Sequence, residues 1–186
     1  MAIYPIILDS CVIFPMPLCD TLLRAAEANL YRVYFSQEIL DGATRNLVKK
    51  GRMTKEKEKR FQAMLKNTFP EAMVEVPARL VESMTNHLGD RHVLAAAIVA
   101  KAEVIVTYNL KHFTADALAP YGIEVQHPDV FLTQLFDNDP DSMVEVIRKQ
   151  FEDLKPPPHT VDELLENLDK NNKVPEFASR VRFYKS

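Results

Sequence analysis

Hydrophobic residues along the chain fall into short continuous runs separated by longer amphipathic stretches. Runs of this kind predict buried strands, which we expect at residues 4–9, 30–35, 73–76, 102–107 and 122–125. Between the runs, apolar residues recur every three or four positions, the spacing of an amphipathic helix. We expect helices over 18–29, after Ser36, over 54–66, near Pro77 and from Asp90. This order predicts an α/β fold with a mostly parallel sheet covered on both faces.

The helix that follows Ser36 contains a glycine in its middle, at Gly42. Ser36 is a favoured N-cap residue, Glu38 stands in the first turn, and the segment K-G-R at 50–52 ends the helix. A glycine inside a helix costs about 1 kcal/mol relative to alanine. A glycine at this position therefore needs a specific explanation, and packing alone is a weak one.

The character of the sequence changes after Asp137. The segment D-N-D-P-D-S at 137–142 caps a helix expected over 142–154, and K-P-P-P-H-T at 155–160 is a stiff spacer. Apolar residues at 161, 164, 165 and 168 then predict the first of two short amphipathic helices. We therefore divide the chain into a main domain, residues 1–137, and a helical C-terminal extension, residues 138–186, which packs on the main domain or on a partner.

The composition, 47% hydrophobic and 26% charged, is that of an ordinary globular protein. No apolar run approaches the roughly 18 residues of a membrane helix, and the N-terminal residues lack the basic region of a signal peptide. We therefore expect a cytoplasmic protein without a membrane segment. Cys11 and Cys19 have no C-x-x-C or Cys/His partner, so free thiols are expected in place of a zinc site or a disulfide framework.

Basic residues are concentrated in one segment although the net charge is −3. Residues 45–60 contain eight Lys/Arg and two acids, whereas residues 137–186 contain eleven acids and eight bases. A basic helical arm fits a protein that touches phosphate at one place. A solvated helix face explains the same pattern equally well, and charge alone does not decide between the two.

Three polar residues from distant segments are expected at one edge of the sheet. Asp9 ends the first predicted strand, Asn109 follows the last long one, and Asp90 begins the helix that precedes it. Ligands of open parallel sheets collect at the carboxyl ends of the strands. Asp90 also has a structural reading as an N-cap and Asn109 as a turn residue. A carboxylate that ends an apolar strand, by contrast, needs compensation for its desolvation.

The residue types favour a hard cation over other chemistries. Carboxylates without a histidine or cysteine cluster suit Mg²⁺ or Mn²⁺. The chain lacks the G-x-S-x-G motif of serine hydrolases and the G-x-x-x-x-G-K-[ST] motif of phosphate-binding loops. A phosphohydrolase with Asp9 as nucleophile would need a second aspartate two residues on, where this chain has Cys11.

Four segments, in order and at plausible spacing, resemble the PIN-domain ribonucleases, and most closely the VapC-type toxins of bacterial toxin–antitoxin pairs: L-D-S-C-V-I-F-P, F-S-Q-E-I-L-D-G-A-T-R-N-L, G-D-R-H-V-L-A-A-A-I and I-V-T-Y-N-L-K-H-F. The resemblance spans about residues 4–135, and the following residues resemble the helical extension of one subgroup. It implies a three-layer α/β/α sandwich whose carboxylates hold one or two Mg²⁺ or Mn²⁺ ions for RNA cleavage. Asp9 and Asp90 match two metal-site acids, and Asn109 matches a residue that helps position the attacking water.

The sequence departs from the family pattern at two positions. Gly42 stands where related toxins usually have glutamate, and His112 stands where they often have aspartate. Three explanations for Gly42 stay open: a substitution that disarms a toxin, a natural replacement by Glu38 or Asp41, or a natural pseudo-nuclease. Glu38 lies one turn before position 42 on nearly the same helix face. His112 reads either as a solvated histidine or as a ligand of metal or phosphate.

The resemblance also implies partners. RNA is the expected substrate, and the candidate phosphate contacts, which position RNA without reading its sequence, are Arg45, Lys49, Lys50, Arg52 and Arg91. The expected protein partner is a cognate antitoxin, which in such pairs often inserts a basic residue into the acidic site. Homodimers are common in the family, although no feature of this sequence shows one. The alternative to a nuclease is a PIN-like module that binds RNA or protein without catalysis.

Overall fold

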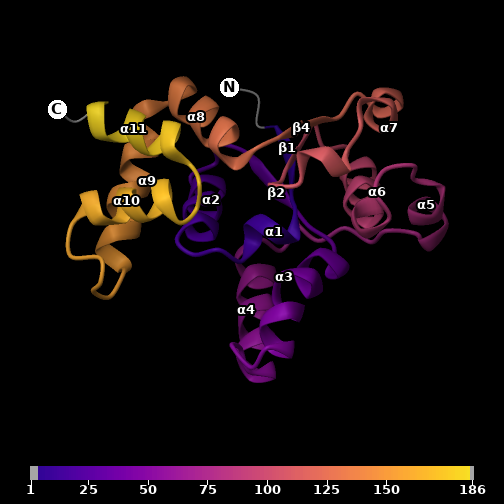
Figure 1. Ribbon diagram of the computed structural model, residues 1–186, viewed down its shortest axis with the longest axis horizontal. Coiled ribbons are helices and arrows are strands. Elements are labelled where there is room, and N and C mark those ends of the chain that lie inside the picture. The colour runs from indigo at the N-terminus through magenta and orange to yellow at the C-terminus, as the bar shows by residue number, and fades with distance from the viewer. Residues whose placement is uncertain (1–3, 185–186) are drawn as a thin grey trace. The chain divides into compact units, whose positions relative to one another are not determined.

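The computed structural model describes residues 4–184, and the chain divides into two compact units. The first unit takes the chain up to Phe14 and then Arg32–Gln126. The second takes Pro15–Tyr31 and the chain from His127 onward. Each unit contains its own helices, and the strands all belong to the first (Figure 1).

A four-stranded sheet forms the centre of the first unit, with the strand order β2-β1-β3-β4 and every pair parallel. The strands are β1 (Pro5–Leu8), β2 (Arg32–Tyr34), β3 (Val104–Val106) and β4 (Glu124–Gln126). Ile7 in β1 aligns with Tyr34 on one side and Ile105 on the other. Ile6, Ile7 and Leu8 are completely or almost completely buried, as expected for a central parallel strand.

The strand expected at residues 73–76 is wrong. Met73 forms only an isolated parallel bridge with Phe35, supported by two backbone hydrogen bonds to the neighbouring Ala72 and Val74. Pro70 and Pro77 flank this segment, and proline supplies no N–H to a ladder. The apolar alternation at residues 73–76, flanked by two prolines, is therefore accompanied by a single bridge and not by a strand.

Helices and short 3-10 turns surround the sheet of the first unit: α1 (Ser10–Ile13), α3 (Gln37–Lys49), α4 (Lys55–Thr68), α5 (Ala78–Ser83), η1 (Leu88–Asp90), α6 (Arg91–Ala100), η2 (Leu110–His112), α7 (Ala115–Leu118) and η3 (Ala119–Tyr121). The alanine-rich helix α6 contacts β1 and β3. Ala95, Ala96 and Ala97 are fully buried, and their small side chains allow the helix to pack closely. In Figure 1, α3 and α4 lie side by side as a helical hairpin.

Local signals define the ends of this hairpin as expected. Ser36 Oγ accepts the N–H of Ile39 at 3.3 Å, which is the N-cap interaction predicted for α3. At the other end, Gly51 has φ +66°, and Arg52 N–H donates to Leu47 C=O at 2.8 Å. A left-handed glycine with this bond is the Schellman arrangement that terminates helices.

The second unit is a cluster of helices: α2 (Leu18–Glu27), α8 (Pro128–Asn138), α9 (Pro140–Asp153), α10 (Val161–Lys170) and α11 (Pro175–Tyr184). Helix α2 packs on α9, and α11 packs on α8, α9 and α10. Thr21 Oγ1 donates to Gln150 at 2.7 Å across the α2–α9 contact, and both side chains are fully buried. The Asp129 carboxylate accepts the N–H groups of Glu176 and Phe177, so α8 supplies the cap of α11.

The expected α/β sandwich with a parallel sheet and a helical C-terminal region is confirmed. Three of the expected tail helices are present, but α8 is an additional helix that the pattern reading did not identify. The division of the chain at residue 137 stays a prediction, and α8 runs across that position. Among the described residues, no helix combines the length and the apolar character required to cross a membrane.

Candidate functional site

Asp9 follows β1 directly, and its carboxylate is buried, with 2% of the residue exposed. Its Oδ2 atom accepts the hydroxyl of Thr107 at 2.6 Å and the thiol of Cys11 at 3.2 Å. Burial raises the pKa of Asp9; these two hydrogen bonds oppose the shift, and the negative charge of Asp90 adds to it. The charge of Asp90 therefore acts on Asp9, although the two residues are 81 positions apart in the sequence.

Asp90 ends the 3-10 turn η1 and precedes α6, but its side chain makes no cap hydrogen bond to the helix. Asp90 therefore occupies the N-cap position of α6, but the predicted capping by its carboxylate is absent. Its Oδ2 atom lies 2.6 Å from Nδ1 of His112, so the imidazole donates to the carboxylate. Asp90 is 16% exposed and His112 24% exposed as side chains, so His112 is no freely solvated histidine either.

A further histidine, His87, joins this pair and was not identified from the sequence. The rings of His87 and His112 are stacked, with centroids 4.0 Å apart and an interplanar angle of 15°. One ligand atom each from His87, Asp90 and His112 lies within 4.8 Å of the others. We call these three residues the His–Asp–His cluster. The spacing His87-x-x-Asp90 was the available signal, because residues three apart share a side of a 3-10 turn.

Thr107 is a second residue that sequence reasoning missed. Its Oγ1 donates to Asp9 and accepts the backbone N–H of Asn109 at 3.0 Å. Cys11 lies 3.2 Å from the same oxygen. Thr107 is fully buried, so one hydroxyl fixes the Asp9 carboxylate relative to the backbone at Asn109. Asn109 is half-buried and precedes η2 as its N-cap residue, without a side-chain cap bond.

Both cysteines are free in the structure, as expected. Burial, followed by the charge of Asp9, raises the pKa of the Cys11 thiol to about 12. Cys19 is completely buried. Since the thiolate is the reactive form, Cys11 serves here as a hydrogen-bond donor.

Gly42 has a packing reason, contrary to our expectation. A Cβ atom at this position would lie 2.6 Å from Oγ and 3.2 Å from Cβ of Ser10 in α1. Ser10 Oγ is itself held by a 2.9 Å hydrogen bond to the carbonyl of Ile39. The glycine therefore allows α1 and α3 to approach closely, and no larger side chain fits without movement of Ser10.

The two acids considered as substitutes for glutamate at position 42 lie on different faces of α3. Asp41 Oδ1 accepts the side-chain amides of Gln37 at 2.8 Å and of Gln62, in α4, at 3.0 Å. Asp41 therefore faces α4, whereas position 42 faces Ser10. Glu38 is exposed and lies one turn before Gly42, so it is the acid that shares the face of position 42.

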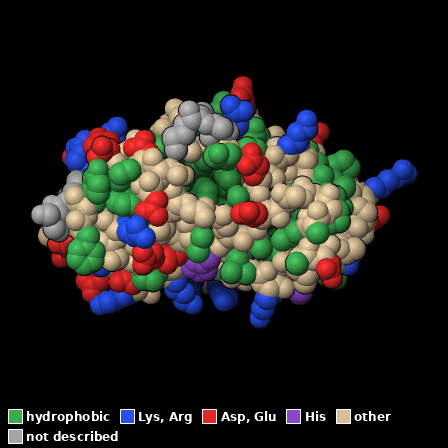
Figure 2. All heavy atoms as spheres, turned by 90° about the horizontal axis from the view of Figure 1, so that it is seen from above, with side chains coloured by type: hydrophobic (Ala, Val, Ile, Leu, Met, Phe, Trp, Pro, Cys, Tyr) green, Lys and Arg blue, Asp and Glu red, His purple; other side chains and the backbone are tan. Residues whose placement is uncertain are grey.

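The expected phosphate contacts are mostly free of acidic partners. Among the described residues, no ion pair involves any of these basic side chains: Arg45, Lys49, Lys50 and Arg52. All four are exposed, at the end of α3 and in the turn that follows it. Arg91 differs, because it is half-buried and its Nε donates to the carbonyl of Asn86. Elsewhere, charged side chains of both signs are interspersed on the face drawn in Figure 2.

The residues present fit a divalent cation. Within the described part of the chain, Asp9 has no Lys or Arg ion pair, although it is buried and repelled by Asp90. A buried carboxylate that lacks a cationic partner is stabilised by a bound cation, whose positive charge offsets the cost of desolvation and repulsion. Asp9 and Asp90 supply the oxygen ligands that Mg²⁺ and Mn²⁺ prefer.

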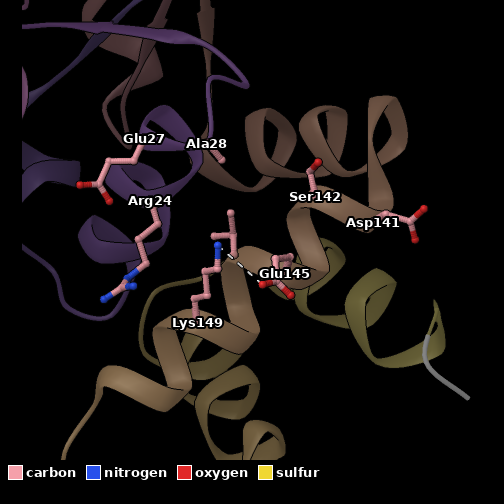
Figure 3. A pocket seen from close by; sticks show the side chains of 8 residues that line it. Arg24, Glu27, Ala28, Asp141, Ser142, Glu145 and Lys149 are labelled. Carbon is pink, nitrogen blue, oxygen red and sulfur yellow. Dashed lines mark ion pairs between the residues drawn. The ribbon is translucent and has the colours of Figure 1, made fainter.

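The second unit carries a pocket of different character. A cavity of about 520 Å³ lies between α2 and α9 and is lined by Arg24, Glu27, Ala28, Asp141, Ser142, Glu145, Val146 and Lys149 (Figure 3). Both basic side chains of the lining are paired within the unit: Lys149 with Glu145 at 3.6 Å, and Arg24 with Asp20 and Asp153. The lining also contains the acids Glu27 and Asp141, so it holds three acids and two bases.

Comparison with known proteins gives two family matches and one relative. The model of the PIN domain matches residues 5–111, and the model of the VapC50 C-terminal domain matches residues 128–183. The chain is also 47% identical over 103 residues to a Mycobacterium tuberculosis protein named "Putative ribonuclease VapC50". That similarity covers 55% of this chain and 60% of the relative's length. Because the PIN model spans more than half of the sequence, the chain belongs to the PIN-domain family.

Proposed function

We propose that this chain is a divalent-metal-dependent endoribonuclease and acts as the toxin of a toxin–antitoxin pair in the cytoplasm. The supporting observation is Asp9, a buried carboxylate without a Lys or Arg ion pair among the described residues, on which the negative charge of Asp90 from a distant segment also acts. The side chain of Asp90 makes no cap hydrogen bond to α6. Similarity to a protein named as a ribonuclease supports the same activity.

In this proposal Asp9 and Asp90 hold Mg²⁺ or Mn²⁺. When bound there, the ion would supply Lewis-acid chemistry for the attack of water on phosphorus. Thr107 holds the Asp9 carboxylate in one orientation through its 2.6 Å hydrogen bond. Asn109, two residues further on, orients the attacking water. Since both residues follow β3, their positions depend on the same strand end.

RNA is bound, in the same proposal, by the basic arm that α3 and α4 form. The exposed cations Arg45, Lys49, Lys50 and Arg52, which make no ion pair among the described residues, contact phosphates. Such contacts raise affinity for any sequence and depend strongly on salt. Arg91 lies at the first residue of α6, next to Asp90, and is suited to the phosphate nearest the reacting bond.

A second candidate function is favoured by the packing of Gly42. Position 42 has no space for a glutamate while Ser10 keeps its present place, and the glycine itself supplies no acid. A PIN-like module that binds RNA or protein without cleaving it would need no acid there. In the nuclease proposal, Glu38 supplies the remaining carboxylate from the same face of α3.

The decisive experiment compares RNA cleavage and RNA binding in the same set of proteins. The wild type should cleave a structured RNA with Mg²⁺ or Mn²⁺, and EDTA or Asp9→Asn should abolish cleavage. The variant Asp41→Asn is the matched control, because Asp41 faces α4 and should leave cleavage unchanged. RNA affinity that persists in EDTA, without cleavage by the wild type, would establish the binding module instead.

The missing acid can be restored with its steric conflict removed. We expect Ser10→Gly combined with Gly42→Glu to cleave RNA faster than Ser10→Gly alone, because the glutamate then has space on the face of Glu38. If neither this double variant nor the wild type shows cleavage that Asp9→Asn removes, the nuclease proposal is wrong.

The antitoxin is the remaining part of the proposal. A basic side chain inserted between Asp9 and Asp90 would relieve their repulsion, as the metal does. Co-expression with the neighbouring open reading frame should therefore yield a complex that copurifies with this chain. Absence of a complex would contradict the toxin–antitoxin assignment while leaving the nuclease assignment intact.

A further inference from the structure

We propose that His87, Asp90 and His112 bind a divalent first-row transition-metal ion through two imidazole nitrogens and one carboxylate oxygen. The inference rests on the proposed function, because it places a second metal position beside the Asp9–Asp90 pair and shares Asp90 with it. The ligand atoms of the His–Asp–His cluster already lie within 4.8 Å of one another. Only small side-chain movements would bring all three to one ion.

The backbone holds the cluster together before any ion binds. His87 N–H donates to His112 C=O at 3.1 Å, which joins the segment before α6 to the turn after β3. Asp90 N–H donates to His87 C=O at 2.9 Å and closes the 3-10 turn. This turn places His87 and Asp90 on the same side. The side chains therefore lie close to a binding geometry before the ion arrives. Little conformational entropy of the chain is then lost when an ion binds.

The geometry leaves ligand atoms available. His112 Nδ1 and Asp90 Oδ2 lie 2.6 Å apart, so an ion would take the place of the proton between them and be bound by both atoms. The second oxygen of Asp90 has no hydrogen bond among the described residues. His87 Nδ1 accepts the N–H of Gly89 at 3.2 Å, a long bond that binding through His87 would exchange for a metal–nitrogen bond.

The position of the cluster also suits a functional ion. His87 is exposed, whereas Asp90 and His112 are half-buried. An ion can therefore enter from solvent, and three protein ligands leave coordination positions open to water. Open sites with three protein ligands are typical of catalytic metal centres, whereas structural sites are usually closed by four.

The ligand set predicts which ion binds. Mg²⁺ prefers an all-oxygen shell and retains its waters, whereas imidazole favours later first-row ions. Affinity for a mixed nitrogen and oxygen site rises from Mn²⁺ through Co²⁺ towards Zn²⁺. The His–Asp–His cluster should therefore select a transition-metal ion in the presence of Mg²⁺, in contrast to the oxygen ligands of Asp9 and Asp90.

Cobalt titration of the metal-free protein, without RNA, tests the site. We expect visible d–d absorption bands to appear on addition of Co²⁺, to persist in excess Mg²⁺ and to disappear when Zn²⁺ displaces the cobalt. The variants His87→Ala and His112→Ala should each weaken Co²⁺ binding by at least about tenfold. The matched control is His159→Ala, an exposed histidine in the loop after α9, which should leave the titration unchanged.

One further variant keeps the test independent of folding damage. His112→Asp retains an ionisable ligand but replaces nitrogen by oxygen, and should shift the preference from Co²⁺ towards Mg²⁺, as measured by calorimetry. Unchanged Co²⁺ binding in His87→Ala and His112→Ala would overturn the proposal. So would a near-ultraviolet sulfur-to-cobalt band, because it would place the ion on Cys11.

Failure of this inference and failure of the nuclease proposal have different signatures. Asp9→Asn should abolish Mg²⁺-dependent cleavage of RNA while keeping the cobalt spectrum of the histidine ligands. A protein that cleaves RNA but binds Co²⁺ equally well without His87 and His112 refutes the His–Asp–His cluster alone. A protein with the cobalt spectrum but without RNA cleavage refutes the nuclease proposal alone.

Discussion

At the residue scale, individual contacts decide what the candidate site can contain. Asp9 lies in a buried position that raises its pKa. At Gly42, Ser10 occupies the space that a side chain would fill. Neither arrangement stabilises the fold of the metal-free chain. Burial disfavours the charged form of Asp9, and a glycine in a helix costs about 1 kcal/mol relative to alanine. Both are typical of functional sites, where local rules are broken.

Asp9→Asn is predicted to stabilise the metal-free protein at neutral pH by about 0.5–2 kcal/mol. An amide still accepts the Thr107 and Cys11 hydrogen bonds, but it carries no charge for burial and Asp90 to oppose. Because the folded-state pKa of Asp9 is raised above 3.8, the native charged form is penalised above the folded pKa, and protonation removes the penalty. Denaturant unfolding in EDTA should show the difference at pH 7 and its loss below about pH 3.8. A destabilising effect at pH 7 would contradict this account.

Gly42→Ala is predicted to destabilise the protein by about 1–3 kcal/mol, because its Cβ would overlap Ser10 Oγ. In the background of Ser10→Gly the same substitution should be neutral or stabilising, since alanine is the better helix former. The four proteins form a double-mutant cycle measured by chemical denaturation. Stabilisation by Gly42→Ala in the wild-type background would show that helix propensity outweighs the contact with Ser10.

At the element scale, the hairpin of α3 and α4 carries the concentration of basic residues. Helix ends fix its geometry: Ser36 begins α3, Gly51 ends it, and Thr54 accepts the N–H of Lys57 at the start of α4. Residues 45–60 contain eight Lys/Arg and only two acids, Glu56 and Glu58. The lysines and arginines near the turn are therefore left with little neutralising charge from their own element.

Replacing Lys49 and Lys50 together by glutamine is predicted to weaken RNA binding without changing sequence preference. Two lost phosphate contacts should lower the magnitude of the slope of log K against log salt by about 1.4 for single-stranded RNA. Lys155→Gln, in an exposed part of the second unit, is the control with an unchanged slope. An equal slope in all three proteins would mean that the hairpin is only a solvated surface.

At the scale of the whole molecule, the two compact units do not follow the order of the chain. Helix α2 comes from the N-terminal part of the sequence but belongs to the unit formed by the C-terminal helices. Its buried Thr21 is bonded to Gln150, and Arg24 pairs with Asp153. Folding of this unit therefore requires segments that are more than 100 residues apart, a non-local arrangement that a linear division into domains cannot represent.

A chain ending at residue 137 is predicted to be aggregation-prone or only partly folded. Truncation would remove α9, α10 and α11 and expose residues of α8 that contact them, such as Phe136, whose ring packs on Tyr184. Burial of such a side chain is worth about 1.5–3 kcal/mol. The control is a full chain cleaved within residues 155–160, where α11 keeps its contacts with α8. Gel filtration and thermal unfolding compare the two. A soluble 1–137 fragment that unfolds as cooperatively as the intact chain would support the division at residue 137.

The sequence by itself determined the features that depend on neighbouring residues. Four strands, the capped helix α3 with its glycine stop, and the amphipathic helices of the tail follow from local periodicity and capping. Asp9 and Asp90 could be named as candidates because each stands at an element boundary. The resemblance of four ordered segments supplied the family.

Only the tertiary structure decided the features that depend on segments far apart in the chain. It placed Ser10 against Gly42, brought the Asp90 carboxylate to His112 in place of the helix N-terminus, and linked His87 to His112 through a backbone hydrogen bond. It also grouped α2 with the C-terminal helices. The physical reason is that periodicity and capping energies are set within a few residues, whereas contact distances, burial and ligand geometry arise only when the chain brings distant segments together.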